Sequence, residues 1–278
     1  EGVPRILEFN ADTPTSLLIG LFLLGILVFG RSKGVKTILS LAFTCLAVFV
    51  VFVPAILAGC NAYITAIVTC LYTIAMTLAL VSGPSKKSVC AALGCAGGVM
   101  VAGILSVIMD HLMKLTGYLD EETLYVSLLN ETNPIDLKAL IFAAIVIGAM
   151  GATMDVAMDI TSALFEIKQK VPDISFWHLV QSGFTIGRDI MGTMANTLIL
   201  AYIGSSLTTV LLYVSYQASL TQMLNRELII VELLQSLCGS IGILCTIPIT
   251  AFIAAGLCCG LPAKRQKESA PTTSPTQK

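Results

Sequence analysis

Two carboxylates stand one helical turn apart inside a long, mostly apolar segment of this 278-residue chain. Asp155 and Asp159 lie within residues 137–164. At 100° per residue, they share one helical face with a set of mostly small residues. This set is Ala144, Gly148, Gly151, Ala152 and Ser162. Small residues let a neighbouring backbone approach, so we expect the carboxylates to face protein or a wet cavity rather than lipid.

A second polar face begins the next apolar segment. It consists of Asp189, Gly192, Thr193 and Asn196, with Arg188 at its start. Arg188 and the end of the 137–164 segment are both expected on the cytoplasmic side, so the two polar faces lie at similar depth and a short antiparallel pairing would bring them together. We therefore predict that Arg188 pairs with Asp155 or Asp159. Two interpretations remain open: an ion- or proton-coupled site, in which Thr193 and Asn196 coordinate a solute, and a buried structural salt bridge that holds the helix register.

The sequence lacks the common patterns of intramembrane catalysis and metal binding. The G-x-G-D and G-x-S-G protease patterns are absent, and the two histidines do not form H-E-x-x-H. The nine cysteines lie in or beside apolar runs and form no C-x-x-C. We therefore expect no catalytic residue, no metal site and no cofactor, and we expect that the protein is not an enzyme. An intramembrane hydrolase is the disfavoured alternative.

The composition places these polar faces in a membrane. Hydrophobic residues make up 56% of the chain and charged residues only 12%, whereas soluble domains are about 25% charged. The mean hydropathy is +0.88. A net charge of −1 gives no indication of nucleic-acid binding. We predict an all-α, polytopic transmembrane helix bundle whose first partner is the lipid bilayer.

Seven apolar stretches are long enough, or nearly so, to cross about 30 Å of hydrocarbon. They cover approximately residues 15–30, 37–58, 62–81, 88–109, 137–164, 190–213 and 234–257. Pro54 and Pro248 fall inside two of them and are expected to kink the helices rather than break them. Most of the 16 basic residues follow the first, third, fifth and seventh stretches. The positive-inside rule then predicts about seven spans of the cell membrane, with the amino end outside and the carboxyl end cytoplasmic.

The remaining segments are assigned by composition. Residues 1–14 are expected to be an external amino-terminal segment that ends a missing upstream region, residues 15–261 the transmembrane bundle, and residues 262–278 a disordered cytoplasmic tail. Residues 172–184 have apolar positions at helical spacing and predict an interfacial helix. Gly94 and Gly98 form a G-x-x-x-G, which predicts close helix packing.

Two stretches, Gly148–Ser162 and Ile186–Tyr202, resemble the YibE/F family of bacterial membrane proteins. The resemblance is most specific in GATMD, residues 151–155, and in GRDIMGTMANT, residues 187–197. It extends over most of the chain, approximately residues 15–261. It implies a polytopic membrane protein in which longer members carry an amino-terminal anchor and an extracytoplasmic region, and it implies no substrate.

We therefore expect an ion- or proton-coupled transporter or permease for a small solute or ion. Its site candidates are Asp155, Asp159, Arg188, Asp189, Thr193 and Asn196. Its helix-packing candidates are Gly94, Gly98, Gly148, Gly151 and Gly192. The alternative is a non-catalytic membrane subunit that works with a membrane protein partner in export or envelope assembly.

Overall fold

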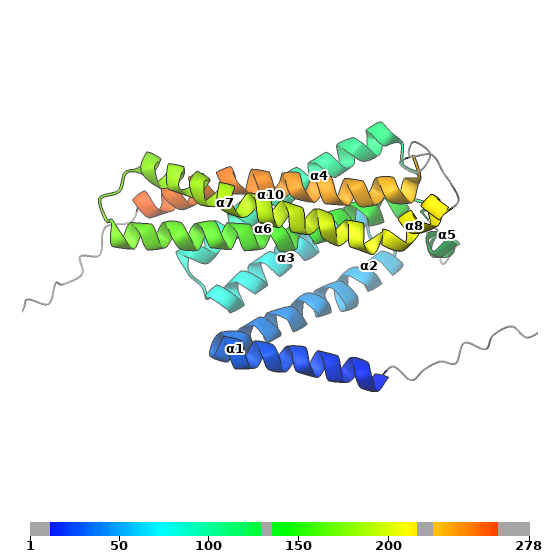
Figure 1. Cartoon of the computed structure of the whole chain (residues 1–278), viewed down its shortest axis with the longest axis horizontal. Coiled ribbons are helices and arrows are strands. Elements are labelled where there is room, and N and C mark those ends of the chain that lie inside the picture. The colour runs from blue at the N-terminus through cyan, green and yellow to red at the C-terminus, as the bar shows by residue number, and fades with distance from the viewer. Residues whose placement is uncertain (1–11, 120, 129–134, 216–224, 261–278) are drawn as a thin grey trace, which may run out of the picture.

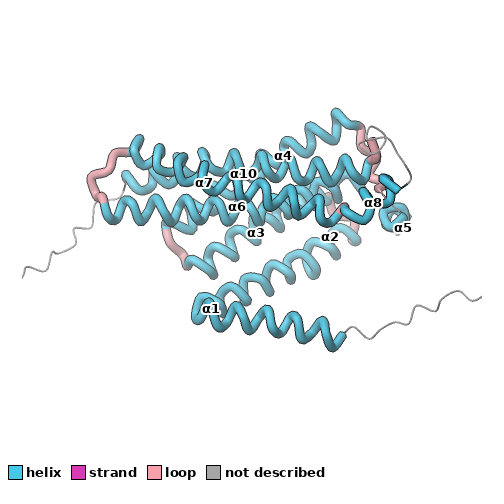
Figure 2. Tube along the Cα trace, viewed as in Figure 1, coloured by secondary structure: helices cyan, strands magenta, loops and turns pink. Residues whose placement is uncertain are grey.

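The computed structural model describes residues 12–119, 121–128, 135–215 and 225–260, and these residues contain helices and no strand. In chain order, the helices are α1 (Asp12–Leu46), the π-helix η1 (Ala47–Phe52), α2 (Val53–Leu57), α3 (Ala62–Ser82), α4 (Lys86–Met113), α5 (Glu121–Leu128), α6 (Leu137–Lys170), α7 (Phe176–Ser205), α8 (Leu207–Ser215) and α10 (Glu227–Cys259) (Figure 1, Figure 2). The predicted all-α class is confirmed. The predicted tail, 262–278, and residues 1–11 of the predicted external segment lie outside the described residues.

Large apolar side chains cover the outside of the bundle, as a lipid environment requires. Phe29 of α1 is 93% exposed, and Leu17 of α1 and Leu112 of α4 are 71% and 66% exposed. Within the described residues, five helices are long and apolar enough to cross a membrane. These are the continuous stretch Pro14–Leu57, then Ala62–Ser82, Lys86–Met113, Leu137–Lys170 and Glu227–Cys259. The chain is therefore a multi-helix membrane protein.

The count of five differs from the predicted seven at two places. The stretch Pro14–Leu57 is one candidate span, although α1 changes direction at Arg31, where φ is 48° and ψ is −127°. This bend lies between the first two predicted spans. The other place is α7, which is not among the five because its polar residues interrupt its apolar stretch. Seven spans therefore remains a prediction.

The basic connections gather at one end of the bundle. The bend of α1, the α3–α4 connection, the α6–α7 connection and the end of α10 all lie at the left in Figure 1. Lys33, Lys86 and Lys168 lie in or next to these segments. The structure thus brings together the charges on which the positive-inside argument rests, while the orientation of this end in the cell membrane remains a prediction.

The core forms around α6, which contacts α3, α4, α7 and α10. Ile145, Ile160 and Leu164 of α6 are fully buried. The contact between α4 and α10 is close because glycines remove the side chains there. A Cβ at Gly94 or Gly98 would overlap Thr250 or Thr246 of α10, so the G-x-x-x-G lies directly on this helix pair.

Residues 172–184 do not form a separate helix, as the prediction of an interfacial helix required. Residues 176–205 form one continuous helix, α7, whose first turn is capped by the Ser175 hydroxyl. The reason is packing against α10: a Cβ at Gly183 would lie 2.8 Å from Ala251, and one at Gly187 would overlap Ile247. Leu179 and Val180 of this segment are therefore buried within the bundle, while Trp177 stays 70% exposed.

The two prolines have different local effects. η1 ends at Phe52, two residues before Pro54. Proline lacks an N–H and crowds the carbonyl four residues earlier, and a wider turn relieves both problems. α10 continues through Pro248 without interruption. Neither proline ends its membrane segment, as predicted.

The carboxylate of Glu227, the first residue of α10, binds the segment that follows α4. Glu227 accepts hydrogen bonds from the backbone N–H groups of Thr116 and Gly117, both at 2.6 Å, and from the Thr116 hydroxyl at 2.7 Å. We expect Glu227→Ala to destabilise this contact by about 1–3 kcal/mol, since charged hydrogen bonds are stronger than neutral ones. Amide hydrogen exchange at Thr116 and Gly117 measures this effect. Glu232→Gln is the control, because Glu232 accepts a longer bond, 3.4 Å, from the Ser205 hydroxyl. Unchanged exchange in Glu227→Ala would contradict the prediction.

Candidate functional site

The α6 carboxylates lie on the outer surface of the single chain. Asp155 and Asp159 are both exposed, on the face of α6 that also carries Gly148 and Gly151. Nothing lies within 4 Å of a Cβ built at Gly151, whereas the Tyr202 hydroxyl of α7 lies 2.5 Å from one built at Gly148. At 1.5 Å per residue, Asp155 is about 27 Å from the start of α6 and about 22 Å from its end. This face, which we call the α6 stripe, therefore crosses the middle of a candidate membrane span.

The polar residues of α7 also face outward. The set is Arg188, Asp189, Gly192, Thr193 and Asn196, and all five are exposed. The Thr193 hydroxyl donates to the carbonyl of Ile190 at 2.8 Å, within its own helix. A Cβ at Gly192 would meet nothing within 4 Å, so this glycine does not mark a helix contact within the chain. The α7 stripe is therefore as open as the α6 stripe.

The structure does not join the two stripes through Arg188. Within the described part of the chain, Arg188 forms no ion pair with Asp155 or Asp159; Lys138 pairs with Asp110 at 4.0 Å and Lys170 with Glu166 at 2.8 Å. The predicted pairing is wrong within one chain. The pairing does not form because α7 packs on α10 through Gly183 and Gly187, which turns the opposite face of α7 outward.

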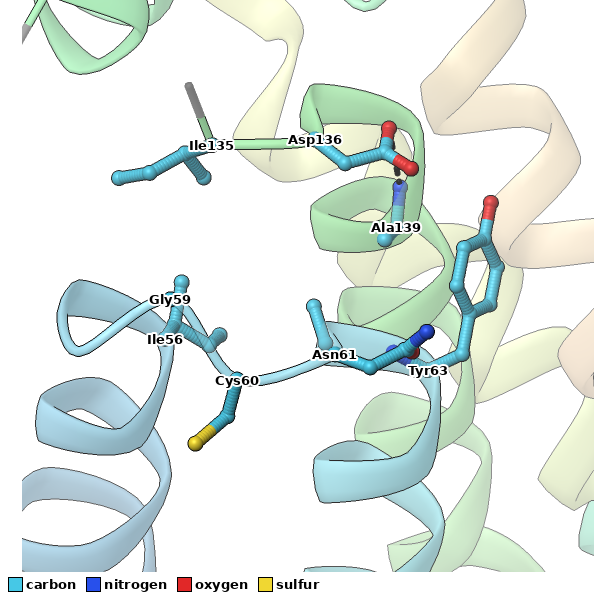
Figure 3. A pocket seen from close by; sticks show the side chains of 9 residues that line it. Ile56, Gly59, Cys60, Asn61, Tyr63, Ile135, Asp136 and Ala139 are labelled. Carbon is cyan, nitrogen blue, oxygen red and sulfur yellow. Dashed lines mark hydrogen bonds between the residues drawn. The ribbon is translucent and has the colours of Figure 1, made fainter. Parts of the chain in front are cut away.

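A small cavity lies at the end of the bundle opposite the basic connections. Its volume is about 240 Å³, and Asn61 and Asp136 are among its lining residues (Figure 3). Both side chains cap helices: Asn61 accepts from the N–H of Tyr63 at 3.0 Å, and Asp136 accepts from the N–H of Lys138 at 3.0 Å. Their first role is thus structural, because each satisfies N–H groups that begin a helix.

The family model of the YibE/F-like proteins matches residues 18–260. That range includes most of α1 and all the helices that the structure describes after it. This chain belongs to the YibE/F-like family. No curated protein and no solved structure matches it.

The YibE/F-like bundle also contains a buried row of hydroxyl and thiol groups that the sequence reasoning missed. Thr153 of α6 donates to the carbonyl of Ala149 at 3.0 Å, and its hydroxyl lies 3.4 Å from the Cys95 sulfur of α4. Thr246 of α10 donates to Gly242 at 2.8 Å. The spacing Gly242, Thr246, Thr250 repeats small residues every four positions and was the available signal. Thr153 and Thr246 thus bond their own helices, the Cys95 thiol of α4 bonds α6, and the buried Thr250 hydroxyl has no hydrogen-bond partner among the described residues.

Proposed function

We propose that this YibE/F-like membrane protein is an ion- or proton-coupled transporter of the cell membrane that works at the α6 stripe. The observation that carries the proposal is the position of Asp155 and Asp159: exposed, near the middle of a candidate span, and without an ion pair to any described residue. An ionised aspartate at the centre of a lipid-facing helix costs about 2.5–3.5 kcal/mol. Two such residues on one face are more readily accommodated where water, an ion or protein covers them.

The proposed roles follow from the chemistry of the side chains. Asp155 and Asp159 alternately hold and release a proton or cation, since carboxylates are the groups that proton relays and cation paths use within membranes. Thr193 and Asn196 of the α7 stripe offer hydroxyl and amide groups to a small solute. Arg188 has no role in this scheme within one chain, because it does not pair with the carboxylates. No enzymatic step is proposed.

Flux measurements on the purified full chain test the proposal. Proteoliposomes carrying a pH-sensitive dye inside are exposed to a proton gradient, and separately to gradients of sodium and potassium. We expect the wild-type chain to move a proton or a cation faster than empty liposomes do. Flux equal to that of empty liposomes under all three gradients would overturn the proposal.

The exposure of the α6 stripe also favours a second candidate, a non-catalytic membrane subunit in export or envelope assembly. In this case another membrane protein covers Asp155 and Asp159. Purification in mild detergent would then yield a stable complex that Asp155→Leu disrupts, and the isolated chain would show no flux. A chain that purifies alone and conducts protons or cations would contradict this candidate.

A further inference from the structure

A long apolar groove runs between α3 and α4. The part of it that lies farther from the basic end of the bundle has a volume of about 440 Å³ and is lined by residues that include Ile67 and Ile74 of α3 and Met100 of α4. Phe142 and Val146 of α6 also line it and form its floor. The groove exists because α3 and α4 contact each other less than either contacts α6.

A second cavity, of about 580 Å³, lies nearer the basic end of the bundle, and its lining residues adjoin those of the first along both α3 and α4. On α4, residues that line the two cavities follow one another at helical spacing: Val89, Ala92, Ala96, Met100 and Ile104. This spacing places them on one face of the helix. The part of α4 that lines the two cavities, Lys86 to Ile108, is about 33 Å long, which is close to the thickness of the hydrocarbon core.

The two ends of the groove differ in chemistry. Lys86, Ser85 and Ser88 lie at the end near the α3–α4 connection, and Lys86 is exposed and forms no ion pair with a described residue. The neighbouring Lys87 does not line the groove; its ammonium lies 5.7 Å from the centroid of the Phe165 ring. The groove is thus apolar along its length and carries a positive charge with hydroxyl groups at one end.

We propose that this groove binds an anionic phospholipid, with an acyl chain along α3 and α4 and the headgroup phosphate against Lys86. Charge and shape both support this occupant: an apolar channel accepts a hydrocarbon chain, and a lysine with no acidic partner accepts a phosphate. Basic pockets between spanning helices are known to bind anionic lipid headgroups. A zwitterionic lipid fits the apolar part but has no net charge to offer Lys86. This site is independent of the α6 stripe and of its proposed transport function.

Native mass spectrometry of the full chain in detergent tests the site, with phosphatidylglycerol and phosphatidylcholine of identical acyl chains as probes. We expect wild-type protein to retain phosphatidylglycerol more strongly. Lys86→Gln should weaken phosphatidylglycerol binding about fivefold, the effect of one lysine near a membrane surface, and should weaken phosphatidylcholine binding less, because the choline ammonium offsets the charge of its phosphate. Ala96→Leu should weaken the binding of both lipids, because the larger side chain fills the groove.

Lys87→Gln is the matched control, since it removes the same charge one residue away and outside the groove. We expect it to change phosphatidylglycerol binding less than twofold. Equal retention of the two lipids by the wild type, equal losses in Lys86→Gln and Lys87→Gln, or undiminished binding in Ala96→Leu would each overturn the proposal. Thermal unfolding of each variant in detergent verifies that it is folded, and a Val99→Ile variant replaces Ala96→Leu if the latter does not fold, with the same expected loss.

Discussion

Gly98→Leu is expected to destabilise the protein by about 3 kcal/mol or more, at or above the upper end of the usual cost of overpacking. A Cβ at this position would overlap the Thr246 hydroxyl and lie 2.9 Å from the backbone carbonyl of Gly242. A side chain can rotate away from a new neighbour, but a helix backbone can move only if α4 and α10 separate. Unfolding of purified protein in detergent, followed by circular dichroism, measures the loss.

Gly256→Leu is the control for this prediction. Gly256 is a helical glycine as well, on α10, but nothing lies within 4 Å of a Cβ built there. We expect its stability to stay within about 0.5 kcal/mol of the wild type, as for surface substitutions in general. Equal stability of Gly98→Leu and Gly256→Leu would show that the close contact between α4 and α10 does not contribute to folding.

Asp155→Asn is expected to lower proton or cation flux about tenfold or more while leaving the fold intact. Asparagine has nearly the same size as aspartate, but it carries no charge and holds no exchangeable acidic proton. A tenfold loss corresponds to about 1.4 kcal/mol of lost interaction in the rate-limiting step. The proteoliposome assay measures the rate, and circular dichroism verifies the helical content.

The control for this carboxylate is Glu166→Gln. Glu166 is another exposed acidic residue of α6, but it lies near the end of the helix and pairs with Lys170 at 2.8 Å. A surface pair of this kind contributes about 0–1 kcal/mol, and we expect Glu166→Gln to leave the flux within twofold. If both variants lose flux equally, the effect reflects the overall charge of α6 and not a site at Asp155.

Helical periodicity predicted which residues share a face but not what that face contacts. Asp155, Asp159 and Gly151 do lie together on the exposed side of α6. Their exposure depends on where α7 packs, and this depends on contacts between Gly187 and Ile247, which are 60 residues apart in the sequence. A pattern within one segment carries no information about such a contact.

For the same reason, the sequence pattern did not predict how the segment before the sixth predicted span packs. Trp177 and Phe184 at helical spacing suit an interfacial helix and the start of a packed helix equally well. In the structure they contact Phe252 of α10, with ring centroids 6.4 and 6.1 Å away. Gly183, between them, was the useful signal, because small residues every four positions favour close helix pairs.

The cysteines provide natural reporters of membrane sidedness. Cys60, in the α2–α3 connection, and Cys259, the last residue of α10, are both exposed, and the connections that they belong to lie at opposite ends of the bundle (Figure 1). A thiol reagent that does not cross bilayers, applied to intact cells, therefore reaches one of the two sulfurs and spares the other. If the amino terminus lies outside and the chain crosses the membrane seven times, as predicted, we expect the reagent to label Cys60.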